Sequence, residues 1–381
     1  MHYSINNLPT NWTNGMKINK LHFENSESSI FNSIHDSNAI HLYDFNFGLL
    51  EPSENQNDSL ELTVVKSLAD NFIVKLSRCR AVTYGGLRIE ITPELVKEIT
   101  FTTSLGSNIS KNSNQPSYYL IVTVDYSTRV PSGNPDPKEE PLRYPKVHPG
   151  YSLSLIESGN YSLSDLNPHS LIIGKFDLKG NDLIWDKSYI PASLNMQCYP
   201  LLRSYYNSIS EEINTIQVSL YNIIYKVINK NQNTPLSFNL KFVCERMIFY
   251  VSSLFFQYRF VLYQKSPIET VNSVVQIANH LKLSIDLLPE KEKEDLLLYF
   301  KEWSDVAPGK FDEFLTSIIE IDYTHQNLAL VFEEVSEFTG FISELFKKLS
   351  ELDLIGKKRG DKNMFVREIN PKQTKKFKII D

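Results

Sequence analysis

Residues 200–230, PLLRSYYNSISEEINTIQVSLYNIIYKVINK, decide the fold of the C-terminal half of this 381-residue chain. Apolar residues recur there at alternating steps of four and three, the heptad spacing of a helix that packs along one seam. The eight seam positions are Leu202, Tyr206, Ile209, Ile213, Ile216, Leu220, Ile223 and Val227. At 1.5 Å per residue, a helix over this stretch is about 45 Å long.

Five more helices are predicted downstream, which makes this half an antiparallel helical bundle. A second seam follows Pro235, at Leu240, Cys244, Met247, Val251, Leu254 and Tyr258. Residues 266–269, Ser-Pro-Ile-Glu, have the form of an N-cap, a first-turn proline and a capping-box glutamate. Two shorter helices are expected near 289–303 and 310–321. The last long helix carries a seam at Leu328, Val331, Val335, Phe338, Ile342, Leu345, Leu349 and Leu352.

The first seam could pack either against other copies of the chain or against helices of the same chain. Isoleucine at the d positions, here Ile209, Ile216 and Ile223, favours coiled coils of three or more strands over dimers. The same seam could instead only close the bundle of a single chain. The five residues Ile209, Ile213, Ile216, Leu220 and Ile223 are therefore candidates for a bundle seam or for a trimer seam.

The chain before residue 195 shows the spacing of β-strands. Apolar and polar residues alternate in 87–92 and in 151–155, as expected when one face of a sheet is buried. Further strand-like runs are 60–66, 72–76, 118–126 and 171–178, separated by turn-forming residues at 85–86 and 131–145. Short strands at this spacing predict a β-sandwich or barrel-like domain.

The predicted fold class is α+β multidomain, with an N-terminal antiparallel β-sandwich followed by an α-helical bundle with heptad seams. The expected domains are a β-sandwich "shoulder" at 1–190, a helical "neck" at 191–355 and a short C-terminal tail at 356–381. A chain of this length and 41% hydrophobic content can supply more than one core.

Charge and composition limit the classes of partner and of site that this protein can have. The formal net charge of −6 lacks the positive footprint that binding to a phosphate backbone requires, so nucleic acid is not expected. The three cysteines are far apart, which argues against a disulfide framework or a structural zinc site. The longest uncharged apolar stretch, 247–258, is too short to cross a bilayer, and residues 1–20 lack a secretory pattern. We expect a soluble, cytoplasmic protein.

Motifs for catalysis are missing from the sequence. It contains no GxSxG elbow, Walker loop, GxGxxG turn or HExxH helix. The histidines closest in sequence, His22, His35 and His41, have no neighbouring cysteine or paired carboxylates at metal-site spacing. Carboxylate pairs for glycoside hydrolysis could be drawn from Asp44 with Glu51 or from Asp182 with Asp186, but acidic residues are numerous enough to pair by chance. The prediction is no enzyme, no cofactor, no metal and no small-molecule substrate.

The N-terminal segment carries a motif of a different kind. Residues 8–18 read LPTNWTNGMKI and are followed by Leu21-His22-Phe23. This resembles the opening signature of the TssK family of type VI secretion systems, in which Trp12, Gly15, Met16, His22 and Phe23 occupy matching positions. Ser188-Tyr189-Ile190-Pro191 is similar to the family's YIPP step into the helical region, with Ala192 in place of the second proline. By motif the resemblance covers about 8–230, including the runs 43–50, 60–66 and 118–124 as its strands.

The resemblance implies a structural baseplate subunit that is a homotrimer. Its shoulder would bind wedge proteins similar to TssF and TssG, with Trp12, Met16 and Phe23 as partner-binding residues. The other interpretation is that Trp12 pins the N-terminal arm to the β-domain and that Phe23 lies in the core, which is the position favoured for Phe23. Gly15 is expected to serve a turn. The protein would act in the bacterial cytoplasm, at the inner face of the cytoplasmic membrane when assembled, linking the wedge to a membrane anchor.

One departure from the family concerns the end of the chain. TssK-like proteins place a globular head after the neck, whereas here about 30 residues follow Leu352. Residues 353–381 contain nine Lys or Arg and four Asp or Glu, a balance of +5. We expect this basic tail either to contact an acidic partner or anionic membrane, or to be a solvated end.

Two other functions stay open at this point. A phage tail adaptor or receptor-binding protein could share this architecture, and it would be recognised by a host-binding or carbohydrate-binding C-terminal domain. A β-sandwich carbohydrate-active enzyme with a helical appendage is the alternative from another class.

Overall fold

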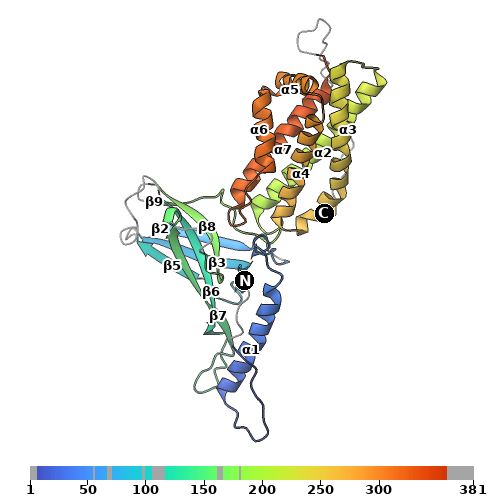
Figure 1. Cartoon of the computed structure of the whole chain (residues 1–381). Coiled ribbons are helices and arrows are strands. Elements are labelled where there is room, and N and C mark those ends of the chain that lie inside the picture. The colour runs from blue at the N-terminus through green and yellow to red at the C-terminus, as the bar shows by residue number, and fades with distance from the viewer. Residues whose placement is uncertain are drawn as a thin grey trace. The chain divides into compact units, whose positions relative to one another are not determined.

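The computed structural model describes residues 7–54, 56–66, 71–96, 99–104, 116–160, 166–179 and 182–357. Two compact units make up the chain (Figure 1). Unit 1 comprises residues 1–207, 259–271 and 322–333, and unit 2 comprises 208–258, 272–321 and 334–381. The N-terminal unit therefore includes three short segments from the helical half of the sequence.

Unit 1 is built on two antiparallel sheets. The first has β3 (Asn71–Val82) at its centre, paired with β1 (Gly48–Leu49), β2 (Leu60–Lys66), β4 (Arg88–Ile91) and β5 (Ile99–Ser104). The second has the order β7-β6-β8-β9, with β6 (Ser117–Ser132), β7 (Lys146–Glu157), β8 (Ser170–Lys179) and β9 (Asp182–Trp185). Both sheets contribute to one apolar core, as a β-sandwich requires.

The alternation seen in the sequence produces this core. Val74 and Leu76 of β3 and Ile89 and Ile91 of β4 are fully buried, and the residues between them, such as Glu90, are not. The predicted fold class is confirmed: an antiparallel β-region followed by a helical region.

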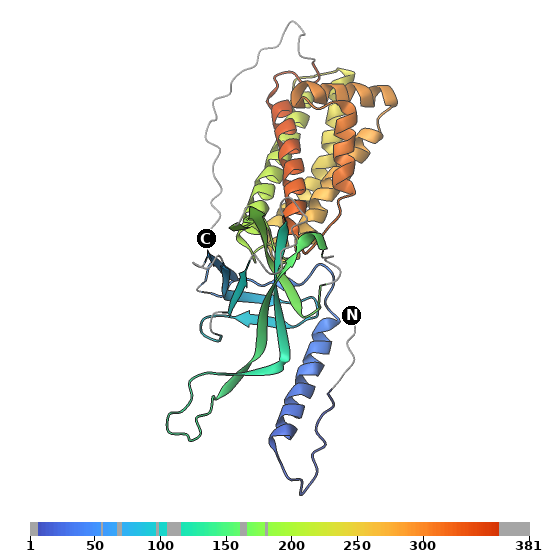
Figure 2. The ribbon, with the colours of Figure 1, turned by 90° about the vertical axis from the view of Figure 1, so that its left-hand side faces the viewer.

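The strands β6 and β7 continue past the four-stranded sheet as a two-stranded arm. Strand β8 pairs with β6 only over 117–123, whereas β7 pairs with β6 as far as Ser132. A bulge between Asp125 and Arg129 marks where the arm leaves the sheet. Figure 2 shows this arm and a blue helix both reaching away from the sandwich.

That helix, α1 (Lys20–Ala39), was not predicted. The expectation that every element before residue 195 is a strand is wrong here. Residues 43–50, expected as a first strand, form strand only at Gly48–Leu49. The Asn46 amide causes part of this difference, because its Oδ1 accepts from Tyr43 N (2.6 Å) and its Nδ2 donates to His41 O (2.8 Å), which closes a turn.

Gly48 shows why the short strand lies where it does. Its φ of +110° and its close approach to residue 192 both exclude a side chain, since an added Cβ would lie 2.0 Å from Ala192 O. Leu49 N donates to Ala192 O (2.8 Å), and Leu194 N donates to Leu49 O (2.8 Å). The Tyr189-Ile190-Pro191-Ala192 step is thus tied to β1 inside unit 1.

The helices of the second half match their predicted positions. They are α2 (Pro200–Asn229), α3 (Pro235–Phe260), α4 (Pro267–Asp286), α5 (Glu290–Ser304), α6 (Pro308–Ile319) and α7 (Leu328–Glu351). Within unit 2, the seams of α2, α3 and α7 are buried together with aromatic side chains from α5 and α6. Phe300 packs against Phe311 at a ring-centroid distance of 5.4 Å and against Phe346 at 6.2 Å.

The first residues of α7 belong to unit 1, and a buried histidine precedes them. His325 Nε2 donates to Phe47 O (2.9 Å), its Nδ1 lies 2.7 Å from Tyr323 Oη, and its ring packs on the Phe47 ring at 4.9 Å. Burial lowers the pKa of His325 to about 4, so the ring is neutral near pH 7. Tyr189 Oη also donates to Gln326 O (2.7 Å).

Among the described residues, no helix combines the length and apolar character needed to cross a bilayer.

Candidate functional site

The N-terminal arm, residues 7–19, folds back on the first turn of α1. Asn19 Oδ1 accepts from His22 N (3.3 Å) and His22 Nδ1 accepts from Asn19 N (3.1 Å), a reciprocal capping box with histidine in place of glutamate. Thr10 Oγ1 donates to His22 O (3.0 Å). Gly15 has φ of +80° in the turn that precedes the cap, as expected. The motif residues thus form one local structure.

Trp12 lies over this first turn and remains half exposed. Its ring centroid is 6.0 Å from that of His22 and 6.1 Å from that of Phe23. Trp12 is 50% exposed and Phe23 is 57% exposed, whereas Met16 is partly buried. The core position favoured for Phe23 is therefore wrong. The residue lies on an exposed side of helix α1, which the sequence did not predict.

Helix α1 presents apolar side chains outward more than inward. Its one fully buried residue is Ser29, and its exposed large apolar residues are Leu21, Phe23, Ile30 and Ile34. Leu8, Trp12 and Ile18 of the arm are exposed as well. We call these seven residues the α1 surface. Among them, Phe23, Ile30 and Ile34 are seven and four residues apart and therefore lie on one side of the helix, and an exposed apolar side of this kind is typical of a docking site.

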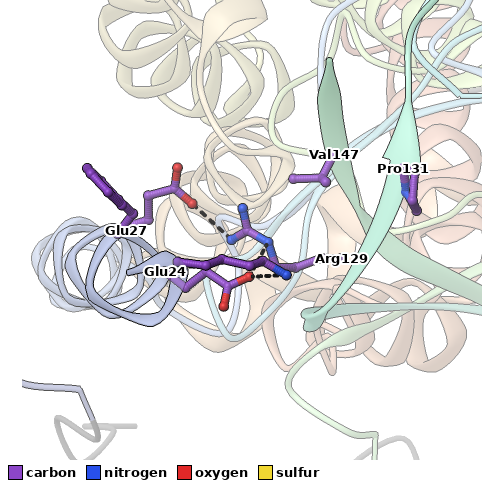
Figure 3. A pocket seen from close by; sticks show the side chains of 7 residues that line it. Glu24, Glu27, Arg129, Pro131 and Val147 are labelled. Atoms are coloured by element: carbon purple, nitrogen blue, oxygen red, sulfur yellow. Dashed lines mark hydrogen bonds and ion pairs between the residues drawn. The ribbon is translucent and has the colours of Figure 1, made fainter. Parts of the chain in front are cut away.

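Few contacts hold α1 to the sandwich. Phe31 stacks on Tyr126 of β6 at 4.3 Å, and His35 Nε2 donates to Gly85 O. Arg129 of the β6–β7 arm reaches two carboxylates of the helix, with Nη1 2.9 Å from Glu27 Oε2 and Nε 3.7 Å from Glu24 Oε1 (Figure 3). These ion pairs are partly exposed, so each contributes at most about 1 kcal/mol.

A groove of about 330 Å³ runs between α1 and the β6–β7 arm. It is lined by Lys20, Phe23, Glu24, Glu27, Arg129, Pro131 and Val147. Figure 3 shows the Arg129 guanidinium between the two glutamates, with Val147 and Pro131 on the arm side. Because the charges pair with one another, the parts left for a partner are apolar, chiefly Phe23 and the half-exposed Val147. Such a groove suits an apolar anchor side chain of another protein.

Solved structures of TssK are similar to this chain. A crystal structure of TssK is 16% identical, with a TM-score of 0.48, covering 87% of this chain and 68% of that one. TssK from the type VI secretion system of EAEC, in complex with a nanobody, is 12% identical with a TM-score of 0.46 over 83% and 95%. A chain of the TssK–TssF–TssG baseplate subcomplex is 11% identical with a TM-score of 0.48 over 91% and 100%. All three are structures of TssK, the family that the N-terminal motif resembles.

Other comparisons return nothing. No family model matches the chain, and no curated protein matches it.

The five seam candidates, Ile209, Ile213, Ile216, Leu220 and Ile223, all lie in unit 2. Each is at most 5% exposed within a single chain. Their apolar surface is already covered by neighbouring helices of the same chain, so it is not free for a second copy.

The carboxylates considered for hydrolysis each have a structural partner. Asp44 accepts from Tyr84 Oη (2.9 Å) and Glu51 accepts from Asn195 Nδ2 (2.7 Å). Asp182 pairs with Lys66 at 2.6 Å, and Asp186 accepts from Ser188 N at 3.0 Å. Burial acts to raise the pKa of Asp186, but the hydrogen bonds from Ser188 and the charge of Lys175 together lower it below its usual value. In the described part of the chain, no group of three or more His, Cys, Asp or Glu could hold a metal ion.

Sequence reasoning missed three residues of this site: Glu24, Glu27 and Arg129. The arginine is 102 positions from Glu27, so no local pattern could pair them. The helix itself had a signal, since Phe23, Ile30 and Ile34 are seven and four residues apart. The many Ser and Asn residues of 20–39, which have modest helix propensity, concealed it.

Proposed function

We propose that this chain is a structural baseplate subunit of a contractile type VI secretion system, a trimeric adaptor that links wedge proteins to a membrane anchor. The wedge partners would be similar to TssF and TssG. It would act without cofactor or catalysis, in the bacterial cytoplasm at the inner face of the membrane.

One observation carries the proposal. The residues that resemble the TssK signature form a single built surface, in which the arm is capped onto α1 and Trp12 and Phe23 are presented to solvent. A motif that served only folding would bury its aromatic residues, since each contributes about 150–250 Å² of apolar area to a core. Large half-exposed aromatics are the residues that anchor protein interfaces.

Assembly through repeated weak contacts is the proposed mechanism. A three-fold connector offers the same docking surface three times, and linkage converts modest single affinities into stable attachment. The domains proposed are those expected from the sequence, a shoulder at 1–190, a neck at 191–355 and a tail at 356–381. The basic tail is proposed to contact the anchor, and it lies outside the described residues beyond Lys357.

Co-purification with the wedge proteins of the same organism tests the proposal. Trp12→Ala should weaken wedge binding by about 2 kcal/mol or more, roughly 30-fold, as for an interface hot spot. Its thermal stability should stay within about 0.5 kcal/mol, because Trp12 is half exposed.

Tyr43→Ala is the matched control, since Tyr43 is an equally exposed aromatic of unit 1 outside the α1 surface. Equal binding by wild type and Trp12→Ala, or an equal loss in both variants, would contradict the assignment of the α1 surface. Failure of the wild-type chain to bind any wedge protein would contradict the function itself.

A further inference from the structure

His22 closes the capping box of α1 in a way that fixes where its ring proton lies. Its Nδ1 accepts from Asn19 N at 3.1 Å, while its own backbone N–H donates to Asn19 Oδ1 at 3.3 Å. A backbone N–H can only donate a hydrogen bond, so Nδ1 carries the lone pair and the ring proton lies on Nε2. A protonated imidazole has a proton on both nitrogens and cannot accept this bond. The capping box therefore exists only while the ring is neutral.

The same residue is where the N-terminal arm meets the helix. Thr10 Oγ1 donates to His22 O at 3.0 Å, and the Trp12 ring lies 6.0 Å from the His22 ring. In Figure 2 the blue arm runs beside the start of α1 before the chain turns into the helix. Because Asn19 is the last residue of the arm, its bond to His22 helps to set the angle at which the arm enters the helix. The position of Trp12 therefore depends on His22.

Histidine at this position differs from the usual capping-box residue. Glutamate or glutamine is the common third residue, and both remain acceptors between about pH 5 and 8, the range in which histidine ordinarily gains a proton. Protonation would also place a positive charge at the positive end of the helix dipole, and the first turn of α1 has no acidic residue to offset it. A cation–π attraction to Trp12 is weak, because 6.0 Å is the outer limit of such contacts. Protonation therefore favours release of the arm.

The other charges at this place stay constant over the same range. The elements that meet at His22 contribute Lys17 from the arm, Lys20, Glu24 and Glu27 from the first turns of α1, and Arg129 from the β6–β7 arm. Lysine, arginine and glutamate side chains ordinarily keep their charges between about pH 5 and 8. Glu24 already pairs with Lys20 at 3.1 Å and with Arg129 at 3.7 Å, so its charge is shared before any imidazolium forms. His22 is thus the group through which pH acts on the arm.

We propose that His22 is a positioning residue that makes the arm sensitive to pH. It holds the arm and Trp12 against α1 while its ring is neutral, and it releases both when the ring is protonated. The consequence for docking rests on the proposed function, in which Trp12 and Phe23 anchor the wedge proteins. A released arm no longer presents Trp12 beside Phe23, so the α1 surface loses part of its apolar area. A fall in pH thus weakens attachment of the subunit to the wedge.

Spin labelling of the full chain tests the release of the arm without any partner. The three native cysteines are buried, so a nitroxide attached at Leu8→Cys labels the arm selectively, at a position where the leucine is 77% exposed. The mobile fraction of the label should rise severalfold as pH falls from about 7.5 to about 5.5, because histidine gains its proton in this range. Circular dichroism at both pH values checks that the chain stays folded.

Two substitutions at the same position bracket the effect. His22→Gln keeps an acceptor that does not titrate, so the arm should stay held at both pH values. His22→Ala has no acceptor, so the arm should be mobile at both. His41→Gln is the matched control, because it removes an exposed histidine of unit 1 outside the arm and should keep the wild-type profile. A wild-type arm whose mobility does not change with pH, or a His22→Gln variant that keeps the pH dependence, would overturn the proposal.

Binding of the wedge proteins at the same two pH values separates this failure from failure of the proposed function. The wild-type dissociation constant should be about 10-fold higher at the lower pH, as for the loss of one capping interaction, and His22→Gln should not show this rise. An equal rise in His22→Gln would place the pH effect outside His22 and overturn its role in docking. If the arm responds to pH as expected but no wedge protein binds at either value, the proposed function fails and the pH-sensitive arm stands.

Discussion

Helices α3 and α7 bury similar seams in unit 2 and expose opposite chemistry. Each has a row of apolar residues at heptad-like spacing with almost no exposed area. The exposed residues of α7 in this unit are all charged: Glu334, Glu337, Glu344, Lys347, Lys348 and Glu351. Those of α3 are mainly phenylalanine and serine. The inner side of a helix is constrained by the packing of its own fold, whereas the chemistry of the outer side can differ from one helix to the next.

The largest expected effect is a difference in stability between substitutions on the inner and the outer side of α2. Ile216 is fully buried, and Val218, two positions later, is half exposed. Ile216→Asp should destabilise unit 2 by about 3–5 kcal/mol or unfold it, because an unpaired charge would be buried. Val218→Asp should change the stability of the monomer by less than about 0.5 kcal/mol.

Both substitutions are best compared by urea denaturation at several chain concentrations, which separates any concentration-dependent contribution to stability. Similar losses in the two variants would show that the outer side of α2 is packed within the single chain.

A second effect, a loss of up to about 3 kcal/mol of stability as pH falls, concerns His325, the buried histidine that precedes α7. The folded-state pKa of His325 is lowered from 6.5 to about 4. Between these values the unfolded chain binds a proton that the folded chain does not. The stabilisation is complete above about pH 6.5 and is lost as pH falls towards 4.

Hydrogen exchange of residues 322–333 between pH 4 and 7 measures this effect, after correction for the intrinsic exchange rate. His325→Gln keeps a neutral polar side chain and should remove the pH-dependent part. An unchanged pH profile in that variant would assign the dependence to another group, such as His169, whose pKa is also lowered, first by burial and then by the charge of His35.

The smallest expected effect tests how α1 is held. Arg129→Ala removes both ion pairs to the helix, yet the melting temperature should change little because these pairs are partly exposed. Amide exchange within 20–39 should become faster, since few other contacts fix the helix. Arg143→Ala, which breaks only the local pair with Glu139 at 2.7 Å, should leave that exchange unchanged.

The sequence predicted the helical half well and the candidate site poorly, for a physical reason. Heptad seams and capping signals such as Pro267 are local, so α2 to α7 match within a few residues. Residues 20–39 have their apolar side chains directed outward and are held by distant partners, so their pattern lacks the usual amphipathic contrast. Phe23 illustrates this, because an aromatic residue beside a strand-rich region is expected in a core. Only the fold of α1 directs it to solvent.

The division of the chain also has a consequence for biosynthesis. Unit 1 is not complete until Glu333 has been made, 126 residues after Asn207. At about 5–20 residues per second, the ribosome needs roughly 6–25 s for that stretch. Until His325 has been made, its hydrogen bond to Phe47 O and its contact with the Phe47 ring cannot form. The packing of unit 1 around Phe47 is therefore completed only after most of the helical residues have been synthesised.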